Sequence, residues 1–382
     1  MIQEVTTTSW GKRIINAFWG ALVGIALIFG AFFLIFWNEG NGLHTSQALA
    51  QTEKVLISVP NKPIDPKNNM HAIYTSGLAT TEDILSDKLL QVSEKAIQLN
   101  RKVEMYQWNE KVETKTEKNM GGSEQEVKTY SYNKQWSTDL IDSSNFKEQA
   151  GHENPSSMLI QPEIQYANKV TLGDYILPSD LIKQINSPKN VDLNKVDIQE
   201  LKNRFNKSVH LQSDQLYIGE DDQTPKIGDT RVSETVVYPQ NVSVVAQQSG
   251  DTLQEYMAPA GHGVSLLEMG QVSPAVMIHN AEVENRIVMW LLRLAGLIML
   301  IIGLALIMSP ISVLADFIPF FGSLVGFGTG FIAFTVGVCL WIIAIAIAWF
   351  IVRPLMSVCI IIVSIVCGYL FFAYKKRGPT KK

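Results

Sequence analysis

The sequence predicts a multi-pass α-helical membrane protein of four spans with a mixed α+β, strand-rich extracytoplasmic domain. Two observations support this prediction. Apolar residues gather near the two ends of the 382-residue chain, in stretches as long as the roughly 20 helical residues that cross a bilayer. Between them, residues 38–286 are polar, and runs of β-branched and aromatic residues alternate there with turn residues, as is typical of strands.

Four apolar stretches are long enough to be transmembrane helices: residues 14–37, 287–308, 323–350 and 355–374. The first has a second interpretation, as a signal peptide, because Ala48-Leu49-Ala50 resembles a cleavage site. Its apolar run is longer than the about 7–15 residues of a signal peptide. We therefore expect it to be retained as an anchor.

Residues 309–322 are expected to form an interfacial connector between the second and third spans. Pro310 and Pro319 are predicted to break the helix. Asp316 is the only charged residue between Arg293 and Arg353. The segment is therefore apolar except for a few polar residues, which is typical of a short interfacial or re-entrant segment.

Basic residues predict the orientation in the membrane. Lys12 and Arg13 precede the first span, and five basic residues follow the last one: Lys375, Lys376, Arg377, Lys381 and Lys382. By the positive-inside rule, residues 1–13 form a cytoplasmic N-terminus and residues 375–382 a basic cytoplasmic tail. Four crossings then place residues 38–286, with Met120, on the extracytoplasmic (luminal or periplasmic) side.

Composition excludes two classes of protein. Gly40 to Arg286 carries a net charge of −10, which argues against a nucleic-acid partner, because such binding depends on Lys and Arg at phosphates. All three cysteines, Cys339, Cys359 and Cys367, lie in the C-terminal apolar block. The polar domain therefore has no disulfide and must fold on an ordinary core.

A long β-hairpin is predicted from Val103 to Trp136, with its turn at Gly121-Gly122. Alternation places aromatic side chains on one face of each strand: Tyr106 and Trp108 on the first, and Tyr130, Tyr132 and Trp136 on the second. They form either a packed face beneath the rest of the domain or an exposed platform for a ligand.

Short helices are predicted at 139–149, 179–184 and 197–206, and a long one from Ser273-Pro274, where Ser suits the N-cap and Pro the first helical position. His152 follows the first of these, in a turn. Its side chain either caps the helix or forms hydrogen bonds within the loop. The alternative is a role in metal binding or catalysis.

The sequence offers no catalytic motif. The six histidines are scattered without ligand spacing, and there is no HExxH, GxSxG or P-loop pattern. We expect a non-enzyme without cofactor or metal.

Glycines in the spans predict helix contacts. Gly20 and Gly24 in the first span, and Gly322, Gly326 and Gly330 along the third, recur every four residues, a spacing that lets helix backbones approach closely. The partner is either another helix of this bundle or a second membrane protein.

Several separated motifs resemble one family. They are Asn38-Glu39-Gly40, VEMYQW at 103–108, YSYN at 130–133 with Trp136, GHENPS at 151–156, GDTRV at 228–232, the LAD and IP around Asp316, and Arg353-Pro354-Leu355. Together they resemble the LUMA (transmembrane protein 43) family over almost the whole chain. One departure is Asn41, where the family pattern has a basic residue.

The resemblance implies a non-catalytic membrane scaffold that assembles with itself or with other membrane proteins. Its animal members imply the endoplasmic reticulum and inner nuclear membrane, with lamin and emerin as partners. The short N-terminus and the cysteine-free domain favour a bacterial inner membrane instead. Two alternatives remain open: a domain that binds or processes an envelope ligand, and an ion-conducting bundle.

A last prediction joins distant charges. Under the four-span topology Glu39, Arg293 and Arg353 lie at one membrane level, where an unpaired charge is costly. We predict an ion pair of Glu39 with Arg293 or Arg353. In the alternative, both arginines reach lipid phosphates by snorkelling and Glu39 faces water.

Overall fold

The computed structural model describes residues 2–212 and 214–352, and the chain divides into two compact units. Unit 1 contains residues 2–5, 48–115 and 127–281, and it is rich in strands. Unit 2 contains residues 6–47 and 116–126 and, of the described residues, 282–352, which are mostly helical. The predicted fourth span, 355–374, the tail, 375–382, and Arg353 lie outside the described residues.

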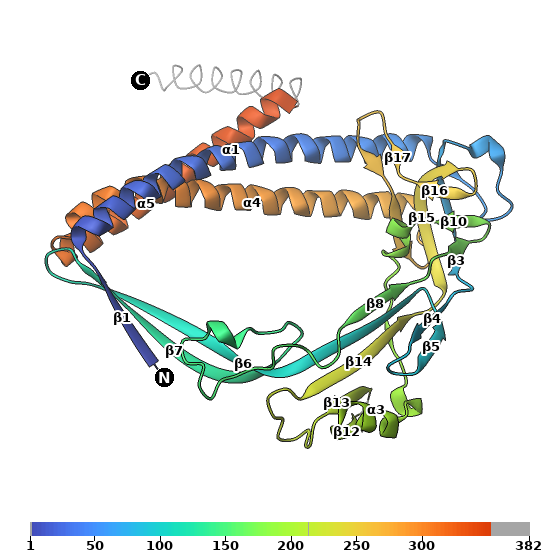
Figure 1. Ribbon diagram of the computed structural model, residues 1–382. Helices are drawn as coiled ribbons and strands as arrows, with labels where there is room; N and C mark the ends of the chain where they lie inside the picture. The colour runs from blue at the N-terminus through green and yellow to red at the C-terminus, as the bar shows by residue number, and fades with distance from the viewer. Residues whose placement is uncertain (1, 213, 353–382) are drawn as a thin grey trace, which may run out of the picture. The chain divides into compact units, whose positions relative to one another are not determined.

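The first sheet of the described chain has eight strands and includes the predicted hairpin. Its order is β1-β7-β6-β14-β13-β12, with β11 beside β14 and β8 beside β6 (Figure 1). These strands are β1 (Ile2–Thr8), β6 (Gln98–Lys118), β7 (Glu124–Ser137), β8 (Glu163–Tyr166), β11 (Lys189–Asn190), β12 (Val209–Gln212), β13 (Gln215–Ile218) and β14 (Thr230–Val237).

The second sheet, in unit 1, has seven strands in the order β19-β15-β16-β10-β9-β3-β2 among the residues described, and β15 also pairs with β3. They are β2 (Ile57–Ser58), β3 (Ala72–Thr80), β9 (Val170–Leu172), β10 (Tyr175–Leu177), β15 (Gln240–Ser249), β16 (Thr252–Gln254) and β19 (Leu266–Met269). Two small ribbons pair β4 (Ile84–Asp87) with β5 (Val92–Lys95), and β17 (Tyr256–Met257) with β18 (Gly263–Val264).

Each sheet of unit 1 covers its own apolar core. Alternate residues of β14, such as Val232 and Val236, pack with Leu99, Leu216 and the helix α3 (Ile198–Phe205). The second core gathers Ile73, Leu172 and Val244 beneath α2 (Ser179–Ile182). Burying each such side chain contributes about 1.5–3 kcal/mol.

Local signals placed several elements correctly. The hairpin turns at Gly121 and Gly122, whose φ angles of +85° and +78° favour glycine. The Asp197 side chain caps α3 by accepting a hydrogen bond from the backbone amide of Glu200.

The helix predicted at 139–149 is wrong: only a 3-10 turn, η2 (Ser143–Asn145), forms there. The Gln107 side chain bonds the carbonyl of Asp139 and the amide of Ile141, which holds this backbone extended instead. The two remaining 3-10 turns of the described chain are η1 (Pro66–Asn68) and η3 (Leu193–Lys195).

Three helices of the described chain are long and apolar enough to cross a membrane: α1 (Trp10–Val55), α4 (Pro274–Ala315) and α5 (Pro319–Val352). The chain is thus a membrane protein with a strand-rich domain; four spans are not seen among the residues described. Figure 1 shows α1 and α4 side by side, and Gly24 of α1 packs on Gly303 of α4.

Two predicted segments differ from the structure. Residues 2–8, within the predicted N-terminal tail, form β1, which pairs with β7. The connector predicted at 309–322 is shorter, because α4 continues through Pro310 to Ala315. Proline removes the N–H that the Leu306 carbonyl would accept, and the Ser309 hydroxyl donates to that carbonyl instead, at 2.8 Å.

Candidate functional site

A buried ion pair joins α1 to α4. The Glu39 and Arg293 side chains are only 3% and 8% exposed. Arg293 Nε donates to Glu39 Oε1 at 2.5 Å and Nη2 to Oε2 at 2.8 Å, a bidentate geometry. The structure therefore brings together two of the three predicted charges. Where Arg353 lies relative to them falls outside the described residues.

Tryptophans from α4 and α5 enclose this pair. Trp349 Nε1 donates to Glu39 Oε2 at 2.8 Å, and Trp341 Nε1 donates to the Arg293 carbonyl at 2.8 Å. The guanidinium also lies 4.6 Å from the centre of the Trp290 ring, within the range of cation–π attraction. Both carboxylate oxygens of Glu39 are thus occupied, and three helices meet at one charge pair.

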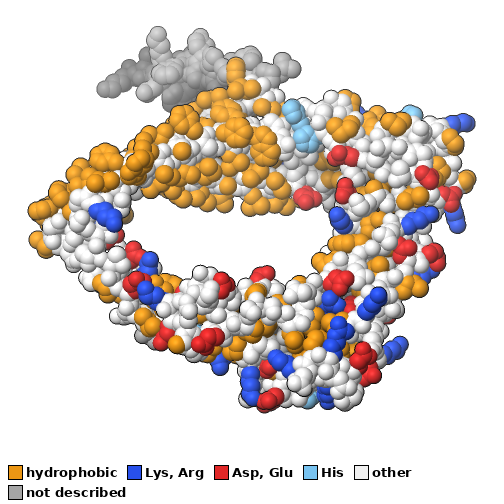
Figure 2. Space-filling view, viewed as in Figure 1, with side chains coloured by type: hydrophobic (Ala, Val, Ile, Leu, Met, Phe, Trp, Pro, Cys, Tyr) orange, Lys and Arg blue, Asp and Glu red, His pale blue; other side chains and the backbone are white. Residues whose placement is uncertain are grey.

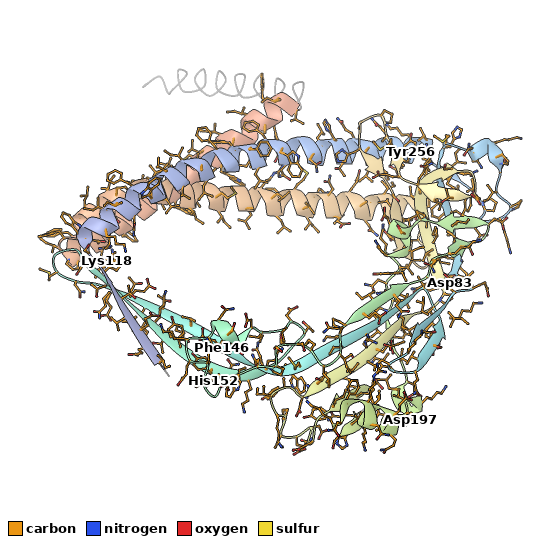
Figure 3. The ribbon with its side chains drawn as sticks, in the orientation of Figure 1. Asp83, Lys118, Phe146, His152, Asp197 and Tyr256 are labelled. Carbon is orange, nitrogen blue, oxygen red and sulfur yellow. The ribbon has the colours of Figure 1, made fainter. Side chains whose placement is uncertain are left out.

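A second buried cluster, centred on Asp316, was not predicted. Asp316 is 1% exposed and follows the last residue of α4. Its Oδ2 accepts from Arg13 Nη2 at 2.5 Å and its Oδ1 from Lys118 Nζ at 2.8 Å. Arg13 also reaches Glu124 Oε2 at 3.0 Å. Figure 3 shows Lys118 at the end of the hairpin, beside the start of α1.

The hairpin turn itself is bonded to the helices. The Gly121 amide donates to the Phe317 carbonyl at 3.0 Å, and Arg13 Nη1 donates to the Gly122 carbonyl at 2.7 Å. The Trp10 indole lies against Gly122 and donates to the Val313 carbonyl at 2.8 Å. A side chain at position 122 would collide with this ring, so close approach as well as turn geometry requires glycine.

A signal for this cluster existed in the sequence. Asp316 is a lone acidic residue in a long apolar block, and intramembrane charges almost always have partners. Sequence reasoning used Arg13 only as an orientation signal and so left Asp316 unpaired.

The predicted glycine contacts divide into two groups. In α1, a Cβ on Gly24 would lie 2.5 Å from the Gly303 carbonyl oxygen, and one on Gly20 would lie 3.7 Å from Leu306. In α5, Gly322 packs on Asp316, a Cβ on Gly326 would lie 4.0 Å from Ser312, and one on Gly330 would meet no described atom within 4 Å. The α1 glycines hold α4 closely, and Gly330 faces open space in the described chain.

The aromatic face of the hairpin is packed. Tyr106 contacts Trp136 with ring centres 5.2 Å apart. His152 stacks on Tyr132 at 3.9 Å and meets Trp108 edge-on at 4.7 Å, and its Nδ1 is 3.2 Å from the Glu148 carbonyl oxygen. His152 and Phe146 lie beside the hairpin in Figure 3. These contacts match the interpretation of a packed face and a loop-bonding histidine.

One carboxyl group of unit 1 is buried without a hydrogen bond. Glu234 in β14 is 1% exposed, and neither carboxylate oxygen has a partner in the described chain. Burial, and then the negative charge of Asp87, raise the pKa of Glu234 to about 8, against the opposing charge of Arg101. Arg101 itself bonds Asp87 and Glu163, so the cluster holds three carboxyl groups around one cation.

Among the described residues, no group of three or more His, Cys, Asp or Glu side chains is placed to hold a metal ion. The buried charges of the long helices are bonded to other side chains: Glu39 to Arg293, and Arg13 to Asp316.

Comparisons with known proteins agree with the sequence motifs. The profile of the family described as Transmembrane protein 43 matches residues 105–354. Human Transmembrane protein 43 is 30% identical over 97% of this chain and 93% of its own length, and the rat protein is 31% identical with the same coverage. The Drosophila melanogaster Transmembrane protein 43 homolog is 25% identical over 90% of this chain and 91% of its own.

These relatives are eukaryotic and give no support to the expectation of a bacterial inner membrane. No solved structure matches the chain. The match of the profile and the near-complete coverage at about 30% identity lead to one conclusion: the chain belongs to the transmembrane protein 43 family.

Proposed function

We propose that the chain is a non-catalytic membrane scaffold whose strand-rich domain assembles with further copies or with other membrane proteins. The observation that carries this proposal is the way its intramembrane charges are used. Glu39 and Asp316 each have both carboxylate oxygens bonded to side chains of the same chain. Such groups fix helices and the hairpin tip, and they have no free oxygen for a substrate.

The alternative of an ion-conducting bundle has less support. Conduction pathways are lined by polar or charged groups that can exchange ligands, whereas the buried charges of the described helices are closed ion pairs. Flux through liposomes that contain the purified protein would separate the two functions, since a scaffold gives no ion flux above empty liposomes.

Crosslinking in the native membrane, followed by mass spectrometry, tests the scaffold proposal. We expect crosslinks between copies of the chain, or to a reproducible set of membrane proteins, above those of an unrelated membrane protein expressed at the same level. A chain that yields only internal crosslinks and is monomeric in mild detergent would contradict a scaffold. So would a substrate turned over by the purified protein.

A further inference from the structure

We infer that unit 2 binds a phospholipid whose headgroup carries a primary amine, with the lipid phosphate at Arg286 and the ammonium group at Glu282. One acyl chain of this lipid lies in a groove along α4. The inference goes beyond the proposed scaffold function, because it names a ligand and the residues that recognise it.

The groove is a cavity of about 550 Å³ on the surface of α4. Apart from Arg286 near one end, its lining is hydrophobic, and Trp341 of α5 contributes one wall. The α4 residues of the lining recur every three or four positions, which places them on one face of the helix. They are Val283, Ile287, Trp290, Leu291, Leu294 and Leu297.

The groove has the length of an acyl chain in one leaflet. From Ile287 to Leu297, α4 rises about 15 Å at 1.5 Å per residue, which is half of the roughly 30 Å hydrocarbon core of a bilayer. Arg286 comes directly before this stretch, at the level where a headgroup would lie. Figure 2 shows hydrophobic side chains covering much of the long helices, as is typical of a surface that contacts lipid.

A second, polar cavity of about 340 Å³ adjoins the groove. The two cavities share Arg286 and Trp290 as lining residues. The second one also includes Glu282 of α4 and Ser46 of α1, whose hydroxyl is a further donor for a phosphate oxygen. An apolar groove therefore leads into a charged cavity, which matches the two parts of a phospholipid.

Two charges of the polar cavity are available to a ligand. Arg293 lines it as well, but its guanidinium is bonded to Glu39. Within the part of the chain that the structure describes, neither the Arg286 nor the Glu282 side chain has a hydrogen bond or an ion pair. Residues 353–382 contain no Asp or Glu and so offer Arg286 no carboxylate. A phosphate group supplies the missing negative charge.

The spacing of these two charges selects the headgroup. Glu282 and Arg286 are four residues apart on a helix, where side chains are neighbours with Cβ atoms about 5–6 Å apart. A guanidinium binds phosphate by parallel hydrogen bonds, and a carboxylate accepts charge-assisted hydrogen bonds from an ammonium group. Phosphatidylethanolamine carries both groups side by side. A headgroup without the amine would leave Glu282 unpaired beside the phosphate.

Native mass spectrometry of the full-length protein, delipidated in detergent, tests the inference. Dioleoyl phosphatidylethanolamine and dioleoyl phosphatidylglycerol, which has the phosphate but no amine, are titrated separately, and the apparent Kd of the first bound lipid is measured. The variants are Arg286→Gln, Glu282→Gln and Leu294→Trp, the last of which fills the groove.

Two matched variants serve as controls. Lys12→Gln removes an exposed basic residue of α1. Ile302→Trp enlarges a 47% exposed side chain of α4 that lies outside the groove. Both should bind each lipid like the wild type. The melting temperature of every variant without added lipid should equal that of the wild type, because the changed side chains are partly or largely exposed.

We expect the wild type to prefer phosphatidylethanolamine to phosphatidylglycerol. Arg286→Gln should weaken binding of both lipids by about tenfold or more, since a hydrogen bond to a charged group contributes at least roughly this factor. Glu282→Gln should remove the preference, and Leu294→Trp should weaken binding of both lipids.

Two results would overturn the inference. Binding by Arg286→Gln and Leu294→Trp that equals binding by the wild type would show that the lipid does not occupy this groove. A wild type that binds phosphatidylglycerol as tightly as phosphatidylethanolamine would show that Glu282 does not recognise an amine. Neither result would bear on assembly of the chain with other proteins, which the crosslinking experiment measures.

Discussion

At the scale of single residues, the Glu39 carboxylate shows how a charge is kept within an apolar helix pair. It accepts two bonds from Arg293 and one from Trp349. Each partner alone would be a buried, uncompensated charge, so removing either side chain destabilises the protein more than removing both.

Breaking this pair should destabilise the helices strongly. Glu39→Gln or Arg293→Gln should each lower the unfolding free energy in detergent by about 3–5 kcal/mol, because the remaining charge is buried and unpaired. The double variant should cost less than the sum of the two. Lys111→Gln, which removes an exposed ion pair with Glu113, serves as the control and should change stability little. Additive costs would mean that the two side chains do not depend on each other.

Glu234 predicts a pH dependence of stability. Its folded pKa of about 8 lies above the ordinary value of 4.5, so the folded state binds the proton more tightly than the unfolded state. This stabilisation is complete below about pH 4.5 and is lost as pH rises through 8. Glu234→Gln should remove this decline, with a gain of the order of a few kcal/mol above pH 8. Thermal melts between pH 5 and 9 measure the difference.

The matched control for Glu234 is Glu82→Gln, whose side chain is 88% exposed. It should leave the pH dependence of the melting temperature unchanged. If Glu234→Gln and wild type differed by the same amount at every pH, the proton on Glu234 would not be the cause.

At the scale of elements, helix contacts depend on which glycines face a neighbour. Gly24 of α1 lies on the Gly303 backbone of α4, whereas Gly330 of α5 meets no described atom. The same residue type at the same spacing therefore has different consequences in two helices.

Leucine at these two positions should separate the roles. Gly24→Leu should lower the melting temperature of the detergent-solubilised chain markedly, because the side chain would force the α1 and α4 backbones apart. Gly330→Leu should leave the melting temperature within error and, if copies assemble through this face, should reduce the oligomer size in mild detergent. Equal melting temperatures for Gly24→Leu and wild type would contradict the close packing of α1 on α4.

Elements whose ends are marked by capping or turn residues could be predicted from the sequence. Pairings between residues far apart in the chain mostly could not. Ser273-Pro274 marks the start of α4 and Gly121-Gly122 the hairpin turn, since capping and turn geometry depend on neighbouring residues. The pairing of β1 with β7 and the contact of Asp316 with Arg13 depend on residues far apart in the chain. The contact of Glu39 with Arg293 is a long-range one that the sequence could suggest, because helix length predicts the two charges at a similar depth.

At the scale of the whole molecule, the Asp316 cluster ties the ends of three elements: α1, α4 and the β6–β7 hairpin. Asp316→Asn should loosen the hairpin tip, because Arg13 and Lys118 would lose their shared carboxylate and keep their positive charges close together. Hydrogen exchange of peptides covering residues 116–126 should become faster. Lys115→Gln, a change at an exposed position of the same strand, should leave this exchange rate unchanged. If exchange were also unchanged in Asp316→Asn, the Asp316 cluster would not be what holds the hairpin tip in place.

The pairing of β1 with β7 also has a consequence for synthesis of the chain. The ribosome releases β1 and α1 first, but the partner strand Glu124–Ser137 and the tip that binds Arg13 emerge much later. The start of α1 must therefore remain without its contacts to the hairpin until the hairpin has been translated. The N-terminal part of this protein therefore cannot reach its final structure before the hairpin has been synthesised. In nascent chains that stop before Ser137, α1 should lack the contacts that hold its start in the full-length protein.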